Sequence, residues 1–80
     1  RANDNDLGLC SYVYTTDLEK ANEASEILET GCVAVNTPAV AVAEAPFGGI
    51  KQTGYGREGG SMAIKDYLNI KYTHFGISYE

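Results

Sequence analysis

The sequence has no tryptophan and, among its 80 residues, only two cysteines, two prolines, one histidine and one methionine. Two cysteines allow at most one disulfide, and with a single histidine they provide no Cys/His cluster of the kind that holds zinc. No apolar run approaches the roughly 20 residues that span a bilayer, and no basic segment leads into an apolar stretch as in a signal peptide. We therefore expect neither a metal site nor a membrane partner.

Basic residues are scarce as well. Six Lys and Arg stand against eleven Asp and Glu, which gives a formal net charge of −5. Residues 1–36 carry this whole excess, because acids and bases balance in residues 37–80. An acidic balance argues against nucleic acid as a partner, since phosphates need a basic face. We interpret the acidic run as a solvated helix face with a polar loop before it.

The first half of the chain has the pattern of a strand–helix–strand unit. Residues 7–15 are rich in aromatic and β-branched side chains and predict a strand buried on both faces. Thr16 and Glu19 have the spacing of a capping box, and Gly31 predicts the end of the helix that follows. Residues 32–35 predict a second buried strand. Short connections between these elements favour an α/β fold with a βαβ crossover or its split variant.

The second half is dominated by a glycine-rich loop. Residues 37–45 are small and apolar without a clear period, and residues 46–60 contain six of the nine glycines. Residues 61–68 predict a short helix. Residues 69–77 predict a terminal strand with one apolar side, which would complete a sheet of this chain or of a partner.

A Gly-x-Gly-x-x-Gly pattern runs from Gly54 to Gly59. The dinucleotide fingerprint needs a strand directly before this pattern and a helix that opens at it. A proline- and glycine-containing loop precedes it here. We therefore interpret the pattern as a tightly turning loop, and an independent nucleotide-binding domain is the less favoured reading.

Cys10 and Cys32 each lie in a predicted apolar strand, where free cysteine is a common core residue. A disulfide between them is the alternative. A catalytic thiolate needs a neighbouring base, and His74 is distant in the sequence. Phe47 is either an anchor of the loop or a pocket wall, and Arg57 and Glu58 are interpreted as a solvated pair at the start of the short helix.

The loop resembles a known family signature. Residues 46–59 read Pro-Phe-Gly-Gly-Ile-Lys-Gln-Thr-Gly-Tyr-Gly-Arg-Glu-Gly, which is similar to the C-terminal signature of the aldehyde dehydrogenase superfamily. Residues 7–9, 31–36 and 67–72 resemble the flanking segments of that family in the same order. The resemblance covers nearly the whole chain.

This resemblance implies that residues 1–80 are a C-terminal fragment of one catalytic domain, without the cofactor-binding domain, the nucleophilic cysteine and the general-base glutamate. Such enzymes oxidise an aldehyde to the acid through a cysteine thiohemiacetal, with NAD or NADP as hydride acceptor. The resemblance implies that other parts of a longer chain bind this cofactor, that the 80 residues alone are inactive, and that the enzyme is cytoplasmic.

The same resemblance implies roles for some residues of this chain. Phe47 matches the aromatic that lines the substrate tunnel, and Glu58 matches a glutamate that supports a proton relay. Residues 37–44 match the loop that closes over the substrate, in which Val40, Ala41 and Val42 would contact the aldehyde. The terminal strand, residues 69–77, matches the region next to the oligomerisation strand of the family, which implies subunit contact in a homo-oligomer (a dimer or a tetramer).

Within the superfamily, the chain most resembles the succinate-semialdehyde dehydrogenase group, on Tyr55, residues 57–60 and residues 43–45. In that group a serine of the closing loop helps to hold the substrate carboxylate, and this chain has Ala41 there, which cannot donate a hydrogen bond. A less polar or differently charged aldehyde is therefore an alternative substrate. A structural or interaction module that assembles through its terminal strand is the alternative to an enzyme segment.

Overall fold

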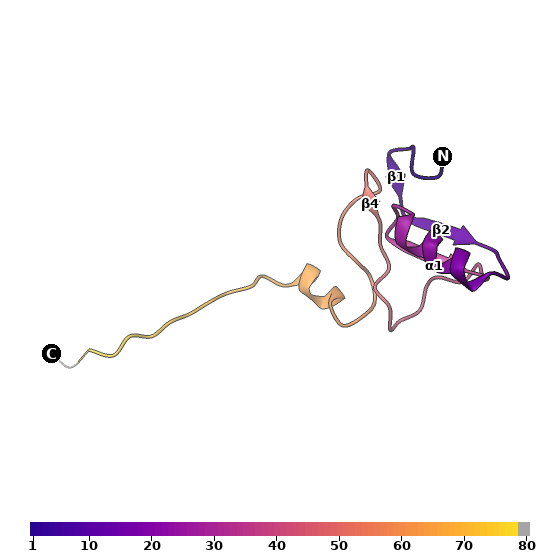
Figure 1. The fold of residues 1–80 in the computed structure, drawn as a ribbon. Helices are drawn as coiled ribbons and strands as arrows, with labels where there is room; N and C mark the ends of the chain where they lie inside the picture. Colours follow the sequence, from indigo (N-terminus) through magenta and orange to yellow (C-terminus); the bar gives the residue numbers. More distant parts are fainter. Residues whose placement is uncertain (79–80) are drawn as a thin grey trace.

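Residues 1–78 are described in the computed structural model, where a small α/β body leads into a long C-terminal tail (Figure 1). The elements in chain order are β1 (Leu7–Gly8), β2 (Cys10–Val13), α1 (Leu18–Ile27), β3 (Cys32–Val35), β4 (Ile50–Lys51) and the 3₁₀ helix η1 (Ala63–Tyr67). The α/β class expected from the sequence is confirmed for this body.

The centre of the body is the β2–α1–β3 unit. Strands β2 and β3 pair in parallel, with Cys10 opposite Cys32 and Val13 opposite Val35. A parallel pair needs a crossover connection, and α1 supplies it. The predicted strand–helix–strand unit is therefore confirmed.

The single strand predicted over residues 7–15 is wrong in its extent, because it divides at Leu9. On one side of the break, β1 pairs antiparallel with β4, so that Leu7 lies opposite Lys51. On the other side of the break, β2 pairs in parallel with β3. Residues 7–13 thus connect the βαβ unit to the glycine-rich loop, which supplies β4.

The predicted complete burial of both strands is also wrong for this chain. Among the described residues, only Ala21 and Ala34 are buried hydrophobic side chains, at 8% and 5% exposure. The sheet of β2 and β3 has only two strands, and one helix of ten residues is too short to cover its surface, so most of that surface is exposed. Tyr12, in the middle of β2, is accordingly half-exposed.

Helix α1 begins one residue later than the capping-box spacing predicts. Asp17, not Thr16, is the N-cap, and its Oδ1 accepts hydrogen bonds from the backbone N–H groups of Glu19 (2.9 Å) and Lys20 (3.3 Å). Aspartate is among the strongest N-caps, because its carboxylate satisfies the free N–H groups of the first turn and also complements the helix dipole.

The helix ends before Gly31, with Leu28 as an extended C-cap. The predicted role of Gly31 as the residue that ends the helix is therefore wrong. Glycine is needed there because a Cβ would overlap the backbone carbonyl of Gly48. Gly31 thus allows a close approach between the start of β3 and the glycine-rich loop.

The segments after the loop are less regular than predicted. The short helix expected over residues 61–68 is a five-residue 3₁₀ helix. Residues 69–78 are extended and exposed and do not pair as a strand, because no neighbouring strand reaches them (Figure 1). The radius of gyration is consequently 19.0 Å, against about 12 Å for a compact domain of this length.

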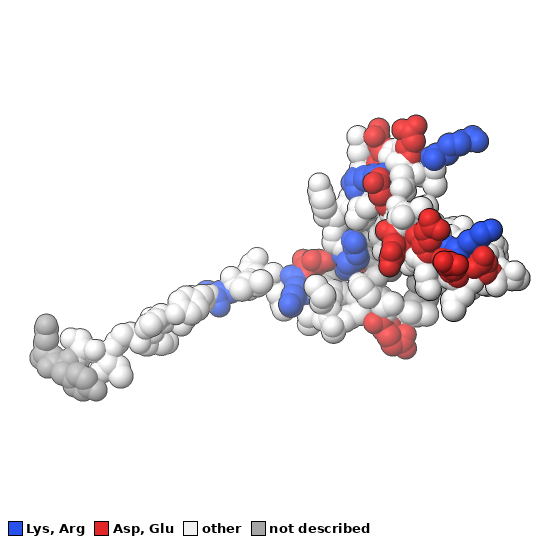
Figure 2. Space-filling model, in the orientation of Figure 1, with Lys and Arg blue, Asp and Glu red and all other residues white. Residues whose placement is uncertain are grey.

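Acidic side chains cover the body rather than the tail (Figure 2). Glu19, Glu23 and Glu26 are all exposed on α1, which confirms the predicted solvated helix face. Within residues 1–78, no helix has the length and apolar character needed to cross a membrane.

We predict that Gly31→Ala destabilises the intact protein, because the added methyl group would meet the backbone of Gly48 and Gly49 rather than a flexible side chain. The expected cost is at least about 1–3 kcal/mol, the usual range for overpacking. Thermal unfolding followed by circular dichroism measures it. Ser25→Ala, at an exposed position of α1, is the matched control. Equal melting temperatures for the two variants would contradict this account of Gly31.

Candidate functional site

The two residues singled out in the loop, Phe47 and Glu58, are paired across it. Each backbone N–H donates to the other's carbonyl oxygen, at 2.6 Å from Phe47 and 2.7 Å from Glu58. This antiparallel bridge closes the glycine-rich loop at its neck. Phe47 and Glu58 are eleven positions apart in the sequence. The bridge therefore brings the backbone atoms that carry the aromatic ring and the carboxylate side by side.

The same two residues line a cavity of about 270 Å³ together with the segment before the loop. Its other walls come from Ala41, Val42, Ala43 and Gly59. Phe47 is half-buried, and Glu58 is exposed. The structure thus brings four of the five predicted site residues together: Ala41, Val42, Phe47 and Glu58.

The fifth, Val40, faces elsewhere. It lines a separate hollow of about 320 Å³ against β3, between Val33, Val35 and Pro46. Val40 and Ala41 thus border different cavities, although they are neighbours in the sequence.

Backbone contacts at the end of the loop place the segment of Ala41 and Val42. The N–H of Gly60 donates to the carbonyl oxygen of Ala43 at 2.8 Å. Gly59 has a φ of +70°, and a Cβ there would lie 2.8 Å from the carbonyl oxygen of Ala45. A glycine at position 59 is therefore required both by its left-handed backbone and by this close approach.

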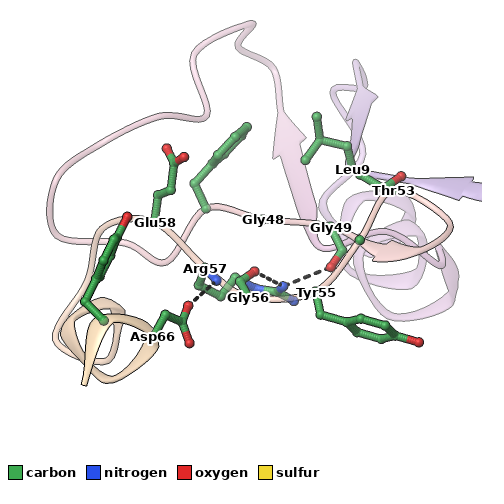
Figure 3. Close-up of a pocket in the computed structure, with 12 residues that line it drawn as sticks. Leu9, Gly48, Gly49, Thr53, Tyr55, Gly56, Arg57, Glu58 and Asp66 are labelled. Atoms are coloured by element: carbon green, nitrogen blue, oxygen red, sulfur yellow. Dashed lines mark hydrogen bonds between the residues drawn. The ribbon is translucent and has the colours of Figure 1, made fainter. Parts of the chain in front are cut away.

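Arg57 and Asp66 hold the other side of the loop (Figure 3). The Arg57 guanidinium donates to the carbonyl oxygens of Gly49 (2.9 Å) and Gly56 (2.8 Å), and the Arg57 backbone N–H donates to Asp66 Oδ2 (3.0 Å). Figure 3 shows the Glu58 carboxylate pointing away from this guanidinium. The side chain of Arg57 thus ties two turns of the loop together, and η1 anchors its backbone through Asp66.

The predicted solvated pair of Arg57 and Glu58 at the start of the short helix is wrong, because η1 begins only at Ala63 and the Arg57 guanidinium binds carbonyl oxygens of the loop. In the part of the chain that is described, the ion pair present joins Lys51 Nζ to Glu29 at 2.9 Å. Reasoning from the sequence missed Asp66, because its partner is a backbone N–H, which every residue except proline carries. Only the position of an acid in the short helix after the loop could have drawn attention to it.

The Gly-x-Gly-x-x-Gly pattern does not have the surroundings of a dinucleotide site. Gly54, Gly56 and Gly59 all have positive φ values and turn the chain. The next element is η1, a five-residue 3₁₀ helix, rather than an α-helix whose N-terminus could hold a pyrophosphate. The Asp66 carboxylate also lies close to Gly56, where its charge would repel a phosphate. The interpretation as a tightly turning loop is therefore confirmed.

Comparison with known proteins identifies relatives along nearly the whole chain. The profile of the "Aldehyde dehydrogenase family" matches residues 1–73. Over 75 residues, the chain is 53% identical to succinate semialdehyde dehydrogenase of Acinetobacter baylyi and 52% identical to 3-sulfolactaldehyde dehydrogenase of Pseudomonas putida. Both alignments cover 94% of this chain, but only 16% and 15% of the relatives.

A solved structure agrees with these matches. The crystal structure of succinate-semialdehyde dehydrogenase from Burkholderia pseudomallei superposes with a TM-score of 0.84 at 46% identity, over 90% of this chain and 15% of that one. The α/β body therefore corresponds to part of a much longer structure. The chain spans about one sixth of the length of the relatives it matches.

We predict that Asp66→Ala loosens the glycine-rich loop. Loss of a hydrogen bond worth about 1 kcal/mol corresponds to about five-fold more frequent opening. Limited trypsin digestion of the intact protein should therefore cleave after Lys51 and Arg57 several-fold faster. Glu26→Ala, which removes an exposed carboxylate from α1, is the matched control. Unchanged cleavage in Asp66→Ala would show that Asp66 does not hold the loop.

Proposed function

Because the chain belongs to the aldehyde dehydrogenase family, we propose that it is a C-terminal segment of the catalytic domain of an NAD(P)-dependent enzyme that oxidises a semialdehyde to the acid. The observation that carries this proposal is the cavity in which Ala41, Val42, Phe47 and Glu58 meet. An aromatic and aliphatic wall suits the carbon chain of an aldehyde, and a carboxylate at its edge suits proton transfer.

In this proposal the segment shapes the substrate tunnel and does not supply the nucleophile. Phe47 packs beside the aldehyde, and the segment of Ala41 and Val42 closes over it. Glu58 supports the proton relay that accompanies hydrolysis of the thioester. Neither Cys10 nor Cys32 acts as the nucleophile, because both lie in the paired strands β2 and β3, away from this cavity.

The cofactor is proposed to bind outside these 80 residues. Relatives of the chain use NAD⁺ or NADP⁺. Within the described residues, the glycine pattern lacks the helix that would hold a dinucleotide. We therefore assign both the nicotinamide site and the nucleophilic cysteine to other regions of a longer protein.

Succinate semialdehyde is the proposed substrate, as the name of the Acinetobacter relative suggests. The name of the Pseudomonas putida relative points to a sulfonated aldehyde instead. Both compounds carry an anionic group at the end away from the aldehyde. The substrate class proposed here is therefore a short aldehyde with a terminal anion.

We also propose that residues 69–77 contribute to a subunit interface. Ile70, Tyr72 and Phe75 are 83–90% exposed on this extended segment, and its backbone is unpaired as a strand. An apolar, unpaired strand is suited to pairing with another chain. The alternative function, a non-catalytic module that assembles through this segment, would use the same surface.

A cytoplasmic location stays a prediction, since one of the relatives is a mitochondrial enzyme of rice.

We predict that Glu58→Gln lowers the kcat of the intact enzyme about ten-fold with little change in KM, because it removes the proton acceptor but keeps the shape of the side chain. NAD(P)H formation with succinate semialdehyde measures the effect. Glu44→Gln, another exposed acid in the neighbouring segment, is the matched control.

The isolated 80-residue chain should form no NAD(P)H with any aldehyde, and turnover by it would overturn the proposal. An intact protein that oxidises no aldehyde would favour the non-catalytic module.

We predict that Ala41→Ser improves the use of succinate semialdehyde. A hydroxyl at this wall of the cavity could donate to the terminal carboxylate, which is expected to lower KM about ten-fold. Kinetics with an uncharged aldehyde of the same length is the control and should not change. If both substrates respond equally, Ala41 does not contact the anionic end.

A further inference from the structure

The two cysteines, which have no part in the proposed function, lie directly opposite each other in the parallel pair. The register of β2 and β3 places Cys10 beside Cys32. Paired residues on neighbouring strands project to the same face of a sheet. Both side chains are half-buried free thiols.

The spacing of the strands suits a bond between these thiols. Neighbouring strands lie about 4.7–4.9 Å apart, and disulfides join Cα atoms that are about 4.4–6.8 Å apart. Burial raises the pKa of Cys10, and the neighbouring Cys32 thiol adds to the rise. The strand register therefore places the two thiols on the same face of adjacent strands before any reaction.

We propose that Cys10 and Cys32 form a modification site, a cross-strand dithiol that hydrogen peroxide oxidises to an intramolecular disulfide. One thiol, as its thiolate, attacks a peroxide oxygen, the O–O bond breaks, and a sulfenic acid and one water form. The second thiol then attacks the sulfenic sulfur, the S–S bond forms, the S–O bond breaks, and a second water leaves. Two thiols and one peroxide thus give one disulfide and two waters.

Oxidation would also change a contact between Cys32 and the glycine-rich loop. Its Sγ–H donates to the carbonyl oxygen of Gly48 at 3.7 Å. A disulfide sulfur has no hydrogen to donate, so the contact between β3 and the loop loses this bond. The strands themselves are already paired, so the fold of β2 and β3 need not change.

Tryptic mapping tests the proposal on the intact protein. After treatment with hydrogen peroxide and blocking of the remaining thiols with iodoacetamide, digestion without reductant should join the peptides of residues 2–20 and 21–51. Each of these peptides contains one of the two cysteines. Mass spectrometry should find the joined pair two hydrogens lighter than the sum of its parts, and dithiothreitol should separate it.

A thiol moved by one residue provides the matched control. In the double variant Cys10→Ser, Ser11→Cys, the thiol lies opposite Val33 and projects to the other face of β2. This variant and Cys32→Ser should give no joined peptide. The proposal is overturned if the wild-type protein gives only separately oxidised or alkylated cysteines, or if the moved thiol links to Cys32 as readily.

Discussion

The contact between the backbones of Gly31 and Gly48 is the constraint on which the rest of the structure depends. It brings the glycine-rich loop against the start of β3, where any side chain on Gly31 would overlap the loop. Lys51 secures the same loop from the other side, with an ion pair to Glu29 and hydrogen bonds to the carbonyl oxygens of Asn3 and Asn5. Close backbone packing and hydrogen bonds therefore hold the loop, since apolar burial in this body is slight.

The geometry of the candidate site depends on this contact between the loop and the start of β3. With the loop held against β3, its neck closes through the bridge between Phe47 and Glu58, and Arg57 ties its turns together. The segment of Ala41 then packs against Gly59 and Gly60 by backbone contacts. Each element of the cavity is placed by main-chain atoms, which leaves the side chains available to meet a substrate.

The large exposed apolar surface agrees with the length of the relatives. Tyr67, Ile70 and Phe75 are each more than 80% exposed along the tail, and the relatives are about six times longer than this chain. Exposed apolar patches of this kind generally mark surfaces that pack against other protein. In the proposed function, a neighbouring part of a longer chain or a second subunit would bury them.

Local patterns in the sequence determined the family, the βαβ order, the acidic helix face and the position of the loop, because each depends on residues that are close together in the chain. Asp17 rather than Thr16 caps the helix, a choice between neighbours that spacing alone could not make. Only the tertiary structure decided that Gly31 serves a close approach, that Asp66 holds Arg57, and that Val40 leaves the cavity that Ala41 lines. These features depend on where distant backbones meet, and a backbone N–H or carbonyl leaves no mark in the order of the side chains.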